Sequence, residues 1–81
     1  MAETIHNGIS LARLKKLLLA AGGEVESVTR TGEVRFRHPL MARPSSRINN
    51  RRSDAPRHAV LFVREVLRLV EEQGQRPLEP R

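Results

Sequence analysis

The chain has 81 residues, a formal net charge of +6, no cysteine, and two phenylalanines as its only Phe, Tyr or Trp residues. This length allows one small domain with a modest core, and the missing cysteine excludes disulfides, thiolate metal sites and a cysteine nucleophile. No apolar run approaches the roughly 20 residues of a membrane span and residues 1–8 lack the pattern of a signal peptide, so we expect a cytoplasmic protein without a membrane partner.

The first predicted elements are an arm and a helix. We expect residues 1–9 to form a flexible arm outside the domain. Ser10 is a favourable N-cap, leucines follow it at helical spacing, and Gly22 suits the left-handed position after a helix. The sequence therefore predicts a helix over residues 10–21, at the start of a single domain that spans residues 10–74.

A hairpin follows the first helix. Residues 24–30 are rich in β-branched side chains, and after a Thr-Gly turn residues 33–37 alternate between apolar and basic types. The alternation directs Phe36 toward the core and directs Arg35 and Arg37 toward the opposite face. The pattern predicts an antiparallel pair of strands with one face that carries arginine.

The basic loop expected at about residues 39–55 is rich in Pro, Ser and Asn. Within it, Ser46–Asn49 could form a short third strand with Ile48 toward the core, because a loop of this length without any element is uncommon in a compact domain. The turn-forming composition and the repulsion between like charges predict that residues 47–57 are mobile in the free protein and become ordered on a polyanion.

The strongest periodic signal predicts a second helix that begins near Ser53 or Asp54, either of which could cap it, and ends at Gly74. Leu61 and Leu69 fall beside its apolar face, where they either flank a wide core stripe or mark a partner surface. Residues 75–81 are predicted to be a disordered tail.

These elements have the order α–β–β–(β)–α, which predicts an α+β fold. Two helices would pack on one face of a small antiparallel sheet, and the other face would be open to solvent. Arg35 and Arg37 would lie on that open face, with the basic loop along its edge.

Eight arginines and two acidic residues between Arg30 and His58 account for the whole net charge. Arginine presents a planar fork of donors that matches phosphate oxygens, so a basic band on a neutral body is typical of a protein that binds nucleic acid or another polyanion. The scarcity of aromatic residues argues against base stacking and favours contacts to the phosphate backbone. The alternative is a solvated loop whose arginines only maintain solubility. The predicted nucleic-acid-binding residues are Arg35, Arg37, Arg47, Arg51, Arg52 and Arg57.

Two histidines, His38 and His58, stand near this band. Either could act as general acid or base on a ribose 2′-hydroxyl, and the alternative is a boundary residue without chemistry. No Gly-rich phosphate loop is present, and the spacing of the histidines is poor evidence for zinc. We therefore expect a binding module without catalytic residues, metal or cofactor. If the chain is an enzyme, we expect a ribonuclease.

The sequence Phe36-Arg37-His38-Pro39, together with Pro56-Arg57-His58 before a helix, resembles the HicA-type toxin family. This resemblance implies a fold similar to double-stranded-RNA-binding domains and an activity that cleaves mRNA. Glu33 and Val34 stand where the family has its hairpin histidine, and the two motifs are farther apart than in the family. The resemblance therefore implies the fold more directly than the activity.

The function predicted from the sequence is binding of nucleic acid, RNA rather than DNA, through phosphate contacts from an arginine-rich strand and loop. The alternatives are a diverged mRNA interferase of toxin–antitoxin type, a protein-interaction module with an acidic protein partner, and a DNA-binding module. The extra apolar residues of the second helix suit a monomer or a weak dimer.

Overall fold

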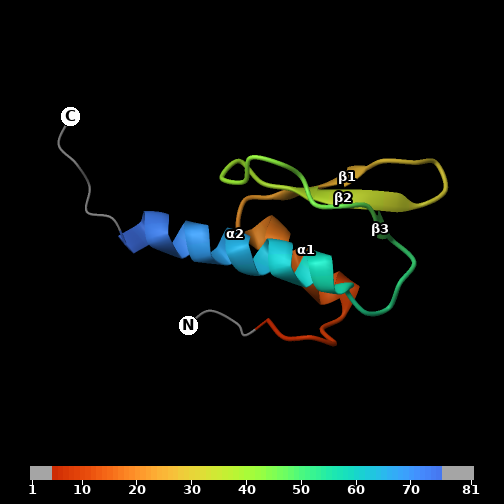
Figure 1. Cartoon of the computed structure of the whole chain (residues 1–81), viewed down its shortest axis with the longest axis horizontal. Coiled ribbons are helices and arrows are strands. Elements are labelled where there is room, and N and C mark those ends of the chain that lie inside the picture. Colours follow the sequence, from red (N-terminus) through yellow and green to blue (C-terminus); the bar gives the residue numbers. More distant parts are fainter. Residues whose placement is uncertain (1–4, 76–81) are drawn as a thin grey trace.

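The structure, a computed structural model, describes residues 5–75 as two helices and a three-stranded sheet (Figure 1). The elements are α1 (Leu11–Ala20), β1 (Glu24–Ser27), β2 (Glu33–Arg37), β3 (Ile48–Asn49) and α2 (Arg57–Gln75). The predicted α+β class and element order are confirmed, including the short third strand.

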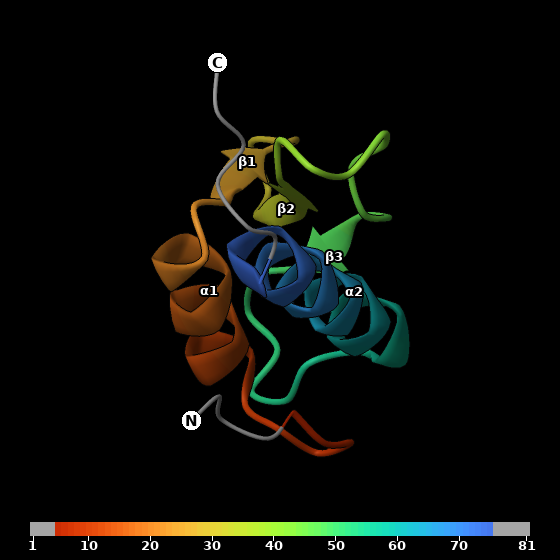
Figure 2. The same ribbon diagram turned by 90° about the vertical axis from the view of Figure 1, so that its left-hand side faces the viewer.

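The sheet is antiparallel, with the strand order β1-β2-β3. Its register places Glu26 opposite Arg35, and Val34 opposite Ile48. Ser45 continues the pairing with β2, because its amide donates to the carbonyl of Phe36 and its hydroxyl accepts from the Phe36 amide, both at 2.9 Å. The two helices lie side by side against one face of the sheet, as predicted (Figure 2).

The core lies between the helices and the sheet. Phe36 of β2 is fully buried, and its ring centroid lies 6.3 Å from that of Phe62 on α2. Leu14 and Leu18 of α1 close the same core, as do Val63 and Val66 of α2, all with no exposed surface. Ile48 of β3 is buried as well, which confirms its predicted orientation.

Capping at Ser10 and two glycines after Ala21 set the limits of α1. The Ser10 hydroxyl accepts a hydrogen bond from the Arg13 amide at 3.1 Å, which confirms the predicted N-cap. Gly22 takes a positive φ of 89° after the helix. A Cβ on Gly23 would lie 2.6 Å from Leu18 Cδ1 and 2.8 Å from the Arg37 carbonyl, so only glycine fits where the chain enters β1.

The predicted start of the second helix is wrong, because α2 begins at Arg57 and neither Ser53 nor Asp54 caps it. The Ser53 carbonyl instead accepts from the Leu11 amide at 3.0 Å, and Asp54 forms an isolated β-bridge with Ser10. These residues are used to join the loop to the N-terminus of α1. The helix also passes through Gly74 to Gln75, beyond its predicted end.

Residues 5–9 belong to the packed domain, which corrects the predicted boundary of the arm. Ile5 and Ile9 are buried and join the core. The Arg64 guanidinium donates to the Ile5 carbonyl at 3.0 Å, and the Ala55 amide donates to the Ile9 carbonyl at 2.9 Å. Residues 1–4 of the expected arm and residues 76–81 of the expected tail lie outside the described residues.

The two leucines predicted to lie beside the apolar face of α2 differ in their exposure to solvent. Leu61 is 46% exposed, whereas Leu69 is half-buried. Within residues 5–75, neither helix combines the length and apolar composition needed to cross a membrane.

Candidate nucleic-acid interface

The open face of the sheet holds the two strand arginines against a carboxylate. Arg35 Nε and Arg37 Nε both donate to Glu26 Oε1, at 2.8 and 2.9 Å. The hydrogen bond from Arg35 lowers the pKa of Glu26 below its ordinary value, and the hydrogen bond from Arg37 lowers it further. The resulting stabilisation is present near neutral pH and is lost as the pH falls through the lowered pKa. It is small, because the Glu26 side chain is 38% exposed and screened by solvent.

This face is therefore balanced in charge, although the sequence predicted an arginine face. The same side of the strands carries three glutamates, Glu24, Glu26 and Glu33, beside Arg35 and Arg37. Paired residues of neighbouring strands lie on one face of the sheet, and successive residues of a strand alternate between the two faces. Arg47 lies 3.8 Å from Glu33 and adds a third cation to this mixed surface. The antiparallel register across a tight turn was the signal that could have placed Glu26 beside the arginines.

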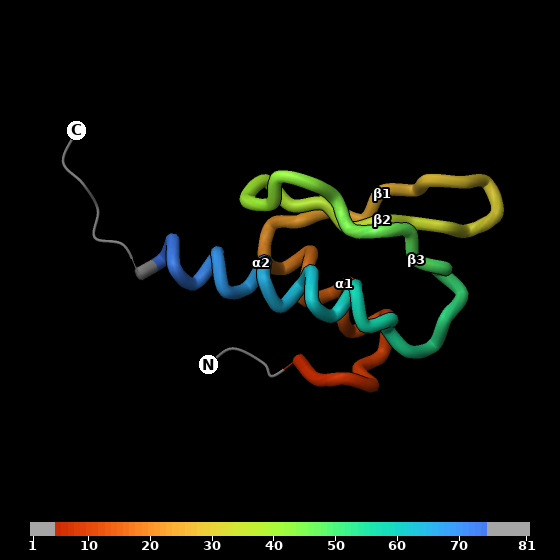
Figure 3. Tube along the Cα trace, viewed as in Figure 1, coloured from red at the N-terminus to blue at the C-terminus, as the bar shows by residue number. Residues whose placement is uncertain are grey.

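A more basic surface lies at one end of the molecule. The β1–β2 turn (residues 28–32), the loop after β3 (residues 50–56) and the first turns of both helices meet there (Figure 3). The Asn50 amide donates to the Gly32 carbonyl at 2.8 Å, and Lys15 Nζ donates to Asn50 Oδ1. We call this surface the basic end, and it carries Lys15, Arg30, Arg51, Arg52 and Arg57.

Within the described part of the chain, most guanidinium groups of the basic end have no counter-ion. Among residues 5–75, Arg30, Arg51 and Arg57 form no ion pair, and Arg52 meets Asp54 only at 3.7 Å. All four side chains are exposed. The first residue of α2 is Arg57, where the helix dipole adds partial positive charge to that of the side chains. Phosphate groups are the ligands that such a surface suits.

The basic end is built on backbone that is tied to the rest of the fold. Bonds from Asn50 to the hairpin turn, from Leu11 to Ser53 and from Ala55 to Ile9 fix the loop at both of its ends. The Arg51 amide also donates to Asn49 Oδ1 at 2.9 Å. These contacts oppose the expectation of a loop that becomes ordered only on a ligand.

The charge that forms one band in the sequence is split in space. The chain leaves β2, turns in segment 38–44 at the other end of the sheet, and returns along β2 to β3 (Figure 1). This segment carries Arg43, which is exposed and forms no ion pair within the described part of the chain. Of the predicted binding residues, the structure groups Arg51, Arg52 and Arg57 and separates them from the sheet face.

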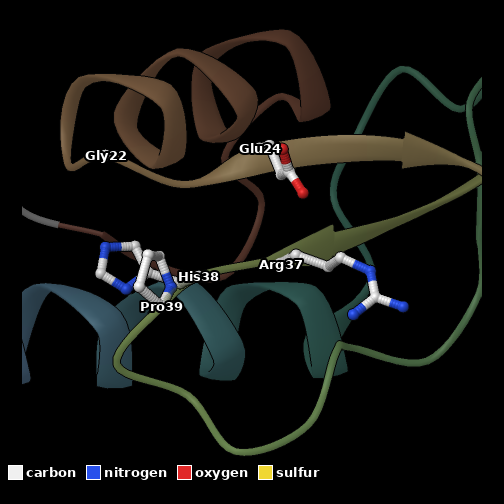
Figure 4. Close-up of a pocket in the computed structure, with 5 residues that line it drawn as sticks. All are labelled: Gly22, Glu24, Arg37, His38 and Pro39. Carbon is white, nitrogen blue, oxygen red and sulfur yellow. The ribbon is translucent and has the colours of Figure 1, made fainter.

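His38 is placed to hold the fold together. It is 8% exposed; its Nε2 lies 2.7 Å from the Ala21 carbonyl, and its Nδ1 lies 3.0 Å from the Leu40 amide. Because a carbonyl only accepts and an amide only donates, Nε2 carries the proton and Nδ1 accepts. A pocket of about 310 Å³ lies beside the ring, lined also by Gly22, Glu24, Arg37 and Pro39 (Figure 4). With both ring nitrogens engaged, His38 joins the end of α1 to the chain after β2.

Replacing His38 by alanine is expected to lower the free energy of unfolding by about 1–3 kcal/mol, because it leaves the Ala21 carbonyl and the Leu40 amide without partners. Urea melts measure this loss. The matched control is His58→Ala, which should cost less than about 0.5 kcal/mol because His58 is exposed in the first turn of α2. Equal costs for the two variants would contradict the structural role of His38.

No family model, curated protein or solved structure matches this chain. The resemblance to HicA-type toxins therefore stays a prediction. In its Phe36-x-His38-Pro39 motif, the phenylalanine is a core residue and the histidine makes two backbone contacts. Both motif residues thus have a structural use in this fold.

Proposed function

We propose that this chain is a nucleic-acid-binding domain, with RNA as the favoured ligand, and that its basic end contacts the phosphate backbone. The observation that carries this proposal is a set of exposed guanidinium groups, at Arg30, Arg51 and Arg57, that have no carboxylate partner among residues 5–75. Bidentate guanidinium–phosphate bonds and the N-terminus of α2 would supply affinity.

The burial of the aromatic residues favours contacts to the phosphate backbone of the nucleic acid over stacking on its bases. Both phenylalanines are in the core, where Phe36 is 0% and Phe62 is 8% exposed. The chain has no Trp or Tyr. Base stacking on aromatic side chains is the usual way to hold single strands without sequence preference, so phosphate contacts are left as the main source of affinity.

The preference for RNA rests on the resemblance to RNA-cleaving toxins and on the α–β–β–β–α order that this resemblance implies. Binding without cleavage is the better-supported activity, because the two nitrogens of His38 are already bonded to backbone. His58 is the remaining candidate for a ribonuclease, since it is exposed beside Arg57. Loss of any RNA cleavage in a His58→Ala variant would identify that role.

An NMR titration with short duplex RNA, duplex DNA and heparin tests the proposal. We expect the amides of residues 28–32 and 50–58 to shift first, because the uncompensated charge lies there. Smaller shifts are expected in β1 and β2, and RNA should act at a lower concentration than DNA. Shifts confined to the open sheet face would contradict the proposed surface. An absence of shifts with all three ligands would favour the acidic protein partner.

A further inference from the structure

Asn50 joins three segments of the basic end. Its amide donates to the Gly32 carbonyl in the β1–β2 turn at 2.8 Å, and its Oδ1 accepts a hydrogen bond from Lys15 Nζ on α1. Asn50 itself lies in the loop after β3, 35 residues from Lys15 in the sequence. A single asparagine therefore connects the hairpin turn, the loop and the first helix.

Local turn geometry does not account for the Asn50 side chain. Asparagine is common in turns because it tolerates a left-handed backbone, but among residues 5–75 only glycines have a positive φ. The neighbouring Asn49 has the local role, since its Oδ1 accepts from the Arg51 amide at 2.9 Å. The side chain of Asn50 instead bonds to a lysine on a distant helix.

The partner that holds Lys15 is neutral, so the lysine keeps its charge. Within residues 5–75 Lys15 forms no ion pair. The Asn50 oxygen takes one of the three donors of the ammonium group and leaves two for another acceptor. Arg35 and Arg37 differ in this respect, because their shared partner is the carboxylate of Glu26.

A cation that is already ordered binds phosphate at a lower entropic cost than a free one. Lysine has a flexible four-carbon side chain, and ordering it on a ligand opposes binding. The bond to Asn50 orders Lys15 before a ligand arrives. Arg51 lies over the same hairpin turn that Asn50 contacts, since its Nε is 3.9 Å from the position of a Cβ on Gly32. Preorganisation of this kind raises affinity without a new contact.

We propose that Asn50 is a positioning residue of the nucleic-acid interface, which holds the Lys15 ammonium at the basic end as a phosphate-binding group. This inference rests on the proposed function, because it concerns the same site. It adds α1 to a binding surface that the sequence placed on a strand and a loop alone. A carboxylate at position 50 would also hold the lysine, but it would cancel the charge that attracts phosphate.

A double-mutant cycle on Lys15 and Asn50 tests the coupling, with fluorescence anisotropy of labelled duplex RNA at several salt concentrations. Asn50→Ala leaves the net charge unchanged and keeps the backbone bond to Gly32. We expect it to reduce the magnitude of the slope of log K against log salt by roughly 0.7–0.9 unit, because the contact of Lys15 with one phosphate is lost. Lys15→Ala should have the same effect, and the double variant should lose no more than Lys15→Ala alone.

Two further variants separate positioning from charge and from shape. Lys16→Ala removes the same charge from the next residue of α1, which is exposed and has no partner within residues 5–75, and it should change the slope by less than about 0.3 unit. Asn50→Asp keeps the size of the side chain and its bond to Lys15 but adds a carboxylate. We expect it to weaken binding more than Asn50→Ala does, whereas a purely structural role would leave it close to the wild type.

The hydrogen bond itself is measured in the free protein. In NMR spectra the ammonium protons of Lys15 should exchange with water more slowly than those of Lys16, and Asn50→Ala should remove the difference. Equal exchange in the wild type, or additive losses of binding from Lys15→Ala and Asn50→Ala, would overturn this inference while RNA binding by the wild type still supports the proposed function. Absence of RNA binding by the wild type would overturn both.

Discussion

Replacing Phe36 by alanine is expected to lower the free energy of unfolding by about 3–5 kcal/mol. The side chain has no exposed surface and lies between β2 and α2, where its ring packs against Phe62. Removing the ring loses its transfer free energy and leaves a cavity that the sheet and helix close only in part. For a small domain this is a large share of a total stability of about 5–15 kcal/mol.

Urea unfolding monitored by circular dichroism measures this effect, and Phe62→Ala provides the companion variant. Phe62 is 8% exposed, so a loss slightly below that of Phe36→Ala is expected. The control is Leu61→Ala, which should cost less than about 1 kcal/mol because Leu61 is 46% exposed. A cost of the same small size for Phe36→Ala and Phe62→Ala would mean that the two rings do not share a core.

Local patterns were sufficient for most of the fold. The leucine spacing after Ser10 fixed α1, and the alternation of residues 33–37 fixed β2, because each pattern reports which face of one element is buried. Ile48 was assigned correctly for the same reason, since a lone apolar residue in a polar loop needs a place in the core.

Long-range contacts account for the boundaries that the sequence did not predict. Ser53 and Asp54 have the composition of helix caps, yet their backbone pairs with Leu11 and Ser10. With Asp54 paired to Ser10, α2 begins three residues later, at Arg57, and local propensity does not reveal that long-range pairing. The burial of Ile5 and Ile9 depends in the same way on where α2 passes, which no local pattern contains.

The candidate site was predicted in composition but not in arrangement. The band of arginine was visible in the sequence, whereas the loop geometry that carries segment 38–44 away from the hairpin turn was not. The pairing of Glu26 with Arg35 and Arg37 follows from strand register, and register is set by the turn and the core face together. Charge that is adjacent in sequence is thus divided in space. On the sheet face Glu26 and Glu33 neutralise the arginines in part, whereas Arg30, Arg51 and Arg57 of the basic end form no ion pair among residues 5–75.

The dependence of binding on salt should separate those two surfaces. Four to five phosphate contacts from the basic end give a slope of log K against log salt of about −3 to −4.5. Affinity should then fall by about 60- to 500-fold between about 50 and about 200 mM salt. The cause is the release of condensed counterions from each phosphate that a guanidinium neutralises. Fluorescence anisotropy with labelled RNA at several salt concentrations measures the slope.

Substituting Arg51 and Arg57 together by alanine should reduce the magnitude of this slope by roughly 1.5 units, because each arginine accounts for one phosphate. Both side chains are exposed, so the fold should not change. The charge-matched control is Arg35→Ala with Arg37→Ala, which removes the same two charges from groups already neutralised in part by Glu26. We expect a change below about 0.5 unit from that pair. Equal changes would show that total charge, and not the uncompensated guanidinium groups of the basic end, drives binding. A larger change from the strand pair would mean that phosphate displaces Glu26 and that the open sheet face is the interface.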